Sequence, residues 1–411
     1  MAELLRRRPG LVVILVFILF CAYSLFRISP EQAGAVRLEY KPRRENIVQS
    51  TNQQPLTPSN QPDLDKTPET PKAHSSSKAF DSAVHPVEGL LKESKTEFSK
   101  IASAQSKTLS EAVKEYRRRY GLAPPPHFDK WFECAQKNEV QMIDEFDMIH
   151  EVITPFWGLK PKTIRSRARE ALGYDNGMIG VAIRDHEVAF VENGQEWQQN
   201  ATVGMLQQFL QYLPDMDLAF NMHDEPRVVI PYDDLTRLVD KAKSEAMPHA
   251  GAQGQPINDF TWKVDDVKGK VRFDEKKQTR FTSIDHQATW ADSRSSCPPD
   301  SPARTIEDEE AVDDIQSYGV GKAGFIYNTT AMRDICLTPS LRSTYGFFDR
   351  PNVYRITREL FPIFSQSKIS SYGDLVYPSP WYWYEKVSYN QTRDVEWAEK
   401  HSRLFWRGST T

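Results

Sequence analysis

The chain has 411 residues, a formal net charge of −4 and 39% hydrophobic residues. This composition excludes a multi-span membrane protein and is sufficient for about two or three domains with apolar cores. Acidic and basic residues are interspersed, which gives no electrostatic reason to expect nucleic acid as a partner. We therefore expect most of the chain to be soluble.

The N-terminus has the pattern of a membrane anchor. Three arginines at positions 6–8 precede an apolar run, Gly10–Phe26, that is long enough to cross a bilayer. A cleaved signal peptide is the alternative, but its apolar run is usually shorter and ends at a small-residue cleavage site. Basic residues stay on the cytosolic side. We expect a cytosolic tail over 1–9, a transmembrane signal anchor over 10–27 and a type II protein of the Golgi or ER membrane.

Glycosylation triplets and cysteines agree with a lumenal body. The Asn-x-Ser/Thr triplets begin at Asn200, Asn328 and Asn390. Cys21 lies in the apolar run, so three cysteines remain outside it. Cys297 and Cys336 bracket an irregular segment that a disulfide could staple, which would leave Cys134 as a free thiol on an aromatic helix.

Residues 28–107 have the composition of a flexible lumenal stem. They are rich in Pro, Ser, Thr, Gln and Lys and poor in aromatic residues, so they cannot bury enough apolar surface to offset chain entropy. A weak helical pattern lies near their end. The folded part is expected to start at Thr108, where Thr108–Glu111 matches a capping box and Gly121 can close the helix.

Two aromatic helices and a bulky loop are predicted next. His127–Asn138 and Asp144–Ile153 each place large apolar side chains at helical spacing, a pattern that more often forms core than a ligand site. Thr154–Leu159 is predicted to be a loop.

The following segments indicate an α/β fold. Met178–Val191 predicts a hairpin, Ala201–Tyr212 a helix, Leu218–Met222 a buried strand and Pro231–Ala246 a second helix. Helix, strand and helix in this order are typical of α/β proteins. Residues 247–314 are expected to form long surface loops.

The C-terminal part regains a pattern. Phe325 and Ile326 predict a strand, Pro351–Leu360 a helix or loop, and Phe361–Ser370 a buried segment. Asp374–Glu385 holds five aromatic residues and two prolines, so it is either a structural plug or a platform for carbohydrate, whose flat apolar faces suit aromatic clefts.

Asp224 is the candidate catalytic residue. It follows the predicted strand in the sequence NMHDEP, and residues just past a strand's carboxyl end line the ligand cleft of open α/β sheets. The alternative is that Asp224 caps a turn before Pro226.

Six stretches in the same order resemble glycosyltransferase family 90, the capsule-associated proteins and protein O-glucosyltransferases, and are most similar to its fungal branch. They are FDKWFECAQ, DEFDMIHEVITPFWG, LPDMDLAFNMHDEPRV, CPPDSPAR, SKISSYGDLVYPSPWYWYE and KHSRLFWRGSTT. The resemblance implies a GT-B fold, in which two Rossmann-like domains face each other across a cleft. Acceptor recognition lies largely in the first domain and nucleotide-sugar binding in the second. Residues 108–411 would form the N-terminal portion, with the donor domain only begun.

The resemblance also implies roles for individual residues. Asp224 falls on the family's catalytic base and His223 on an acceptor-side neighbour. Ser409 would contact the nucleotide sugar within the donor-binding motif formed by Arg407, Gly408 and Ser409. The acceptor-contact region is matched by Trp381, Tyr382 and Trp383.

The implied reaction is an inverting transfer of xylose or glucose from a UDP-sugar to a hydroxyl of a glycan or protein. The hydroxyl must lose a proton as the bond forms, and a carboxylate base typically contributes roughly 10²- to 10⁴-fold. Arginine, backbone N–H groups and a helix N-terminus can stabilise the departing diphosphate in place of a metal. We therefore expect neither metal nor other cofactor.

Two acidic patterns invite other interpretations. Asp215-x-Asp217 resembles a Mn²⁺ motif of the other large glycosyltransferase fold, but Asp215 lies in a turn and Asp217 opens a strand. Asp144, Glu145 and Asp147 could mimic a glycosidase pair, but carboxylates on a helix face are usually solvated.

The sequence given stops directly after the proposed donor motif. In the family a second half should follow, so we expect a fragment of a longer enzyme. The alternative is a catalytically inactive, membrane-tethered acceptor-binding module.

Overall fold

The structure is a computed structural model that describes residues 85–253, 255–269, 271–320, 324–351, 355–383 and 389–406. The chain divides into two compact units, Met1–Pro68 and Glu69–Thr411, and every described residue belongs to the second. The predicted tail and anchor, most of the predicted stem, and the donor motif Arg407, Gly408 and Ser409 lie outside the described residues. Within the described ranges, no helix has both the length and the apolar character needed to cross a membrane.

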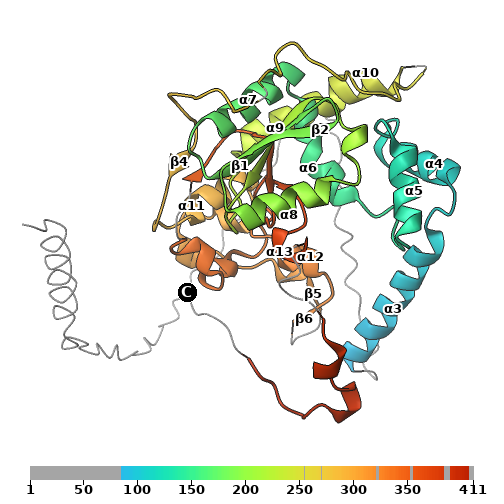
Figure 1. Cartoon of the computed structure of the whole chain (residues 1–411). Helices are drawn as coiled ribbons and strands as arrows, with labels where there is room; N and C mark the ends of the chain where they lie inside the picture. Colours follow the sequence, from blue (N-terminus) through green and yellow to red (C-terminus); the bar gives the residue numbers. More distant parts are fainter. Residues whose placement is uncertain are drawn as a thin grey trace, which may run out of the picture. The chain divides into compact units, whose positions relative to one another are not determined.

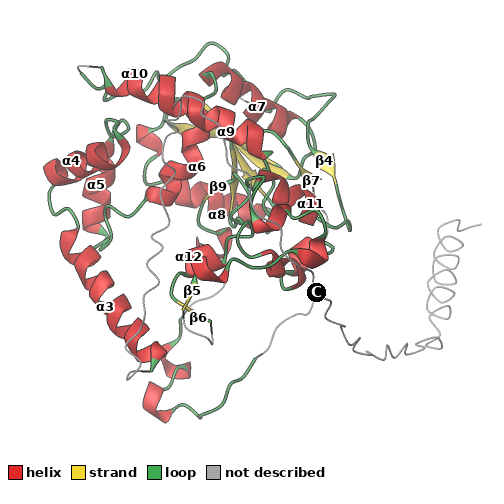
Figure 2. Ribbon diagram, turned by 180° about the vertical axis from the view of Figure 1, so that it is seen from behind, coloured by secondary structure: helices red, strands yellow, loops and turns green. Residues whose placement is uncertain are grey.

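A mixed five-stranded sheet forms the centre of this unit (Figure 1). Its strands are β1 (Met178–Arg184), β2 (Glu187–Glu192), β3 (Met216–Asn221), β8 (Ile363–Ser365) and β9 (Leu375–Val376). They lie in the order β2-β1-β3-β8-β9. β1 is antiparallel to both β2 and β3, whereas the β3–β8 and β8–β9 pairs are parallel. Helices surround these strands (Figure 2), so the predicted α/β fold is confirmed in its coarse form.

The β1–β2 hairpin is confirmed and turns at Asp185 and His186. Both residues have positive φ, 51° and 68°. A two-residue loop with two positive φ angles matches the right-handed twist of the flanking strands. β1 has neighbours on both sides and is buried along its whole length.

The side chains of β1 alternate between two hydrophobic cores, as the period of a strand requires. Met178 and Ala182 belong to the core that also contains Ala171 and Leu172 of α7 (Pro161–Gly173) and Leu238 of α9 (Tyr232–Lys241). The intervening side chains of β1 pack with Leu206 of α8 (Glu196–Leu206). The sheet is thus covered by helices on both faces.

Three of the described helices that precede the sheet in sequence correspond to predicted helices. α4 (Leu109–Tyr120) starts at the predicted capping box of Thr108 and Glu111 and ends at Gly121, whose φ is 66°. α5 (Phe128–Lys137) and α6 (Asp147–Trp157) match the predicted aromatic helices. The loop predicted over Thr154–Leu159 is wrong in its first part, because α6 continues through Pro155. Pro155 lies in the last turn, where a missing N–H costs only one helical hydrogen bond.

Other boundaries also differ from the predictions. Part of the predicted stem is the helix α3 (Pro86–Ala104), which has a proline in its first turn and an N-capping His85. α8 starts before the predicted Ala201, at a capping box of Gln195 and Gln198, and ends at Leu206. The 3₁₀ turn Leu210–Tyr212 follows separately. The starts of α3 and α8 were mispredicted because their N-caps are histidine and glutamine, whereas the usual N-cap residues are Ser, Thr, Asp and Asn.

The remaining elements are short. The helices are α10 (Met247–Gly251), α11 (Trp290–Ser293), α12 (Thr329–Met332) and α13 (Pro380–Trp383). The two small antiparallel sheets pair β4 (Thr282–Ser283) with β7 (Arg355–Ile356) and β5 (Gly319–Val320) with β6 (Phe325–Ile326). The predicted strand at Phe325 and Ile326 is confirmed, and most of 247–314 consists of loops as expected.

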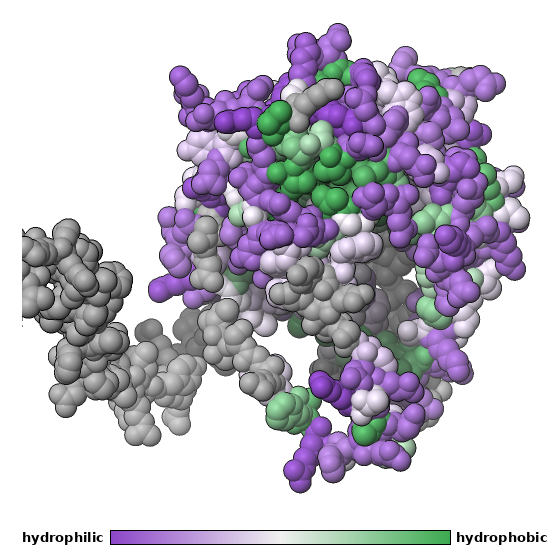
Figure 3. Space-filling view, in the orientation of Figure 1, coloured by the Kyte–Doolittle hydropathy of each residue, from purple (hydrophilic) through white to green (hydrophobic). Residues whose placement is uncertain are grey.

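A disulfide joins Cys297 to Cys336, the pairing that the sequence predicts, with a Cα–Cα distance of 5.3 Å. Cys297 is fully buried in a hydrophobic cluster with Trp290, Ile335 and Phe348. Cys134 is a free, exposed cysteine on α5. The surface on the side seen in Figure 3 is mostly hydrophilic, and a prominent apolar area lies in its upper part, where the β1–β2 hairpin lies in Figure 1.

Candidate functional site

The parallel strands bring three distant segments to one edge of the sheet. Because β3, β8 and β9 run in the same direction, their carboxyl ends meet at the same edge. Asp224 follows β3, Gln366 follows β8 and Ser379 follows β9. Gln366 Nε2 donates a hydrogen bond to Asp224 Oδ1, and Ser379 Oγ donates to Gln366 Oε1 at 2.6 Å. The three residues therefore form one hydrogen-bonded chain.

Asp224 is exposed but held in position. Its backbone carbonyl accepts from Ser367 Oγ, and its Oδ1 accepts from Gln366. Oδ2 accepts no hydrogen bond from any described residue. A carboxylate with one oriented oxygen and one open oxygen can accept a proton from a bound hydroxyl. A turn cap would instead accept from a nearby backbone N–H, which Asp224 does not do within the described part of the chain.

A buried polar group fixes the loop that carries Asp224. Asp374 is 0% exposed and accepts hydrogen bonds from Arg227 N and Val228 N, both at 2.8 Å, and from Ser365 Oγ at 2.6 Å. Burial raises the pKa of Asp374 to about 6, and these three donors oppose the rise. The other end of the loop is held by Asn221, whose Nδ2 donates to the carbonyl of Glu225 at 2.6 Å.

His223 is half-buried and contacts Asn221, which holds the loop that carries Asp224. Its backbone N–H donates to Asn221 Oδ1 at 3.1 Å. Burial lowers the pKa of His223, and the nearby Arg227 guanidinium adds to the effect, so the imidazole is neutral at pH 7. Gly177 gives it room: a Cβ there would lie 3.1 Å from His223 Nε2, and the φ of 70° also favours glycine.

The predicted aromatic residues lie on α13 next to this edge. Trp381, Tyr382 and Trp383 are 43%, 79% and 46% exposed, which does not fit a buried structural plug. The Trp381 backbone N–H donates to Ser379 Oγ at 3.4 Å, which joins α13 to the Asp224 chain of hydrogen bonds.

α13 is also fixed against α8. The Trp381 ring lies 4.8 Å from Trp197, measured between ring centroids. Trp383 packs so closely on Gly204 that a Cβ there would come within 2.2 Å of the indole Nε1. Packing against α8 therefore holds two partly exposed tryptophans in position on the helix that is joined to Asp224 by hydrogen bonds. Tyr384, at the end of the same aromatic run, lies outside the described residues.

The two aspartates of the Asp215-x-Asp217 motif have structural partners. Asp217 forms an ion pair with Arg184 at 2.7 Å, with side chains only 7% and 6% exposed. Asp215 Oδ1 accepts from Asp185 N at 2.8 Å in the hairpin turn. Across the described ranges, no three His, Cys, Asp or Glu side chains gather as a group that could hold a metal ion.

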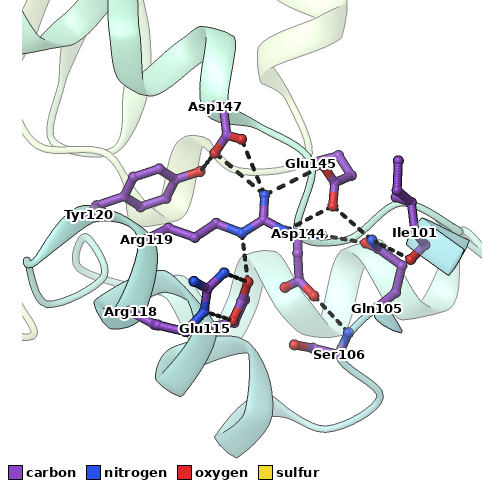
Figure 4. Close-up of polar contacts among 10 residues, drawn as sticks. All are labelled: Ile101, Gln105, Ser106, Glu115, Arg118, Arg119, Tyr120, Asp144, Glu145 and Asp147. Carbon is purple, nitrogen blue, oxygen red and sulfur yellow. Dashed lines mark hydrogen bonds and ion pairs between the residues drawn. The ribbon is translucent and has the colours of Figure 1, made fainter. Parts of the chain in front are cut away.

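The acidic residues near α6 belong to a separate charged network (Figure 4). Arg119 on α4 contacts Glu145 at 2.9 Å and Asp147 at 3.3 Å. Asp144 Oδ2 accepts from Ser106 N at 2.7 Å. These carboxylates are therefore partnered and not simply solvated, which corrects the reason given for setting aside a glycosidase pair. Their pairing with arginine still leaves them in a structural role.

The asparagine of each glycosylation triplet is exposed, whereas Ala201 and Thr202 of the first triplet are buried. Asn200 lies on α8, Asn328 caps α12 by accepting from Ala331 N, and Asn390 Oδ1 accepts from Thr392 N at 3.0 Å. Each side chain is accessible to a modifying enzyme.

Sequence reasoning missed the residues that orient the base: Gln366, Ser379, Asp374 and Arg227. Gln366 lies inside the segment Phe361–Ser370 that was predicted to be buried. Its place just past the apolar residues Ile363 and Phe364 could have marked a strand end, and strand ends carry site residues. Asp374 and Arg227 carry no such signal, since a buried hydrogen bond between a backbone N–H and a carboxylate 147 residues apart depends on the tertiary fold.

No protein-family model, curated protein or solved structure matches this chain.

Proposed function

We propose that the chain forms the acceptor side of an inverting glycosyltransferase of the GT-B type, similar to family 90. It would transfer xylose or glucose from a UDP-sugar to a hydroxyl of a glycan or protein. One observation carries this proposal: Asp224 stands exposed at the carboxyl edge of the parallel strands and is joined through Gln366 and Ser379 to the aromatic helix α13.

The proposed reaction follows from this geometry. An acceptor hydroxyl donates a hydrogen bond to the open Oδ2 of Asp224. Asp224 takes the proton while the hydroxyl oxygen forms the bond to the anomeric carbon, and UDP leaves from the opposite face with the bonding electrons. Gln366 fixes the other carboxylate oxygen, so little reorientation is needed during the reaction.

The surroundings suit a carbohydrate or peptide acceptor. The exposed faces of Trp381 and Trp383 can stack against the apolar face of a sugar ring. His223 is neutral and adds no positive charge that would stabilise ionised Asp224 and lower its basicity. On the donor side, Arg407, Gly408 and Ser409 are proposed to bind the nucleotide sugar without a metal or another cofactor.

Two further features support a lumenal location. The disulfide between Cys297 and Cys336 is typical of oxidising compartments, and the asparagines of the three glycosylation triplets are exposed. Together with the apolar run at 10–27, they favour a type II protein anchored in the Golgi or ER membrane.

The second candidate is a membrane-tethered module that binds the acceptor without catalysing transfer. It is favoured by the fact that the described residues form a single large sheet, which holds the proposed base and aromatic platform. Both candidates share the acceptor site and differ in donor use.

The experiment that tests both incubates the full chain with UDP-xylose or UDP-glucose and a panel of glycan and peptide acceptors. UDP release and product mass report transfer, and a separate titration reports acceptor binding. Asp224→Asn should keep the fold and acceptor binding but lose most transfer, whereas Asp233→Asn on α9 should behave as the wild type. Acceptor binding without transfer supports the second candidate. Transfer at wild-type rate by Asp224→Asn rules out Asp224 as the base, and lack of both activities refutes both proposals.

A further inference from the structure

A cavity lies in the helical part of the fold, apart from the edge that carries Asp224. It has a volume of about 300 Å³ and is enclosed mainly by α4, α5 and α6. None of its lining residues belongs to the candidate glycosyltransferase site. The rings in its lining include those of Tyr116, Tyr120, Phe128, Trp131, Phe146 and His150, together with His127. A cavity of this size accommodates a small organic molecule.

Three pairs of these rings meet at steep angles, whereas Tyr120 stacks on His150 at 4.0 Å and 20°, and Phe128 stacks on Trp131 at 4.9 Å and 25°. Together the rings form the walls of an aromatic box. Tyr116 contacts Tyr120 at 4.7 Å between centroids, with 74° between the ring planes, and contacts Phe128 at 5.7 Å and 62°. Trp131 meets Phe146 at 5.5 Å and 83°. Aromatic faces carry negative electrostatic potential, so a box of such rings attracts a cation.

The rim of the cavity carries excess negative charge (Figure 4). Glu115 and Asp144 line the cavity, and Glu145 and Asp147 are attached to it through Arg119. Arg118 pairs with Glu115. Four carboxylates against two guanidinium groups leave this network with a net charge of −2.

The polar groups of the rim are already engaged with one another. Arg119 donates to Glu115, Glu145 and Asp147, and Tyr120 Oη donates to Asp147 at 2.6 Å. Among the described lining residues, His127 Nε2 and His150 Nδ1 are buried atoms without a hydrogen-bond partner, so few donors remain for the hydroxyl groups of a sugar. Burial lowers the pKa of His150, which keeps its ring neutral, so it does not repel a bound cation. The engaged rim and the neutral His150 favour a ligand held by its positive charge and by apolar contacts over a ligand that needs many hydrogen bonds.

We propose that this cavity binds a small organic cation, an alkylammonium group whose apolar body fills the aromatic box. The rings hold the charged group through cation–π contacts, and the acidic rim attracts it. The site is independent of the proposed transferase reaction, because its residues do not contact those that orient Asp224.

The test titrates the full chain with choline and with its uncharged isostere 3,3-dimethylbutan-1-ol, using calorimetry. A cation–π contribution of about 0.5 to 2 kcal/mol predicts that choline binds about 2- to 30-fold more tightly than the isostere. Trp131→Leu should reduce this preference, because it removes one of the rings that contact the charged group. Asp147→Asn, a surface change that retains hydrogen bonding to Tyr120, should weaken choline binding and leave binding of the isostere unchanged. Glu133→Gln on α5, outside the network, should leave both affinities unchanged.

Equal affinity for choline and its isostere would overturn the proposal, and so would absence of choline binding. Methyl glucoside is the third ligand of the titration. If it binds more tightly than choline, the cavity is a carbohydrate site and the cation proposal is wrong. Because Asp147 is a surface residue, its variant keeps the test decisive even if Trp131→Leu does not fold.

Discussion

Removal of the Cys297–Cys336 disulfide is expected to destabilise the protein strongly. The two cysteines are 39 residues apart, and closing a loop of that length in the unfolded chain corresponds to about 4 kcal/mol in the chain-entropy model. The segment they bracket has mainly short helices and loops, and its Ala303 and Ile335 pack into a hydrophobic cluster with Trp290, which lies outside the segment. Replacing both cysteines by alanine should therefore lower the free energy of unfolding by about 3 to 5 kcal/mol.

Urea unfolding followed by tryptophan fluorescence measures this difference. Cys134→Ala is the matched control, because Cys134 is exposed and forms no disulfide. This substitution should change the urea midpoint of unfolding little. Reductant should shift the wild type toward the double variant and leave the double variant unaffected. A loss below about 1 kcal/mol would refute the reasoning, because it would mean that the segment is held by packing alone.

Three other changes probe the candidate site. Gly204→Ala would place a Cβ about 2.2 Å from the Trp383 indole, which must then move by about 1.2 Å to reach an ordinary 3.4 Å contact. This shift should weaken acceptor binding up to about 10-fold, whereas the control Glu196→Ala on the same helix should not. Unchanged affinity in Gly204→Ala would show that Trp383 does not belong to the acceptor site. Gln366→Leu removes one hydrogen bond from Asp224, so kcat measured by UDP release should fall about 10-fold with KM nearly unchanged. An effect on KM alone would contradict an orienting role of Gln366. The folded-state pKa of His223 is below its usual 6.5, so acidification from that pH should reduce stability as the unfolded state takes up the proton first. His223→Gln should flatten that part of the stability profile, and an identical profile would show that other groups cause it.

The sequence predicts elements whose signals are local. The hairpin at Asp185 and His186 and the capped helix at Thr108 follow from short patterns, and both are found close to their predicted positions. The partners of Asp224 could not be predicted in this way. Gln366 and Ser379 reach it only because β8 and β9 extend the sheet beyond β3, and those strands have three and two residues, too few for a periodic pattern.

Helix α7 (Pro161–Gly173) was not predicted from the sequence. It begins with proline and has buried alanines and a leucine at helical spacing, but its many charged residues weaken the apolar signal. The aromatic stripes of α5 and α6 were predicted to be core. Phe132 and Ala135 are indeed buried, but Trp131 and Phe146 line a cavity, because spacing alone does not show whether the facing surface is filled.

The long separation of Asp224 and Gln366 also sets the order of assembly during synthesis. They are 142 residues apart, and at about 5–20 residues per second the ribosome needs about 7 to 30 s to produce the second after the first. The cysteines of the disulfide emerge within that interval and can pair before β8 exists. The nascent chain must therefore keep the edge of β3 uncovered until its parallel neighbour arrives. Such an exposed strand edge is a binding target for a chaperone of the compartment where the chain folds.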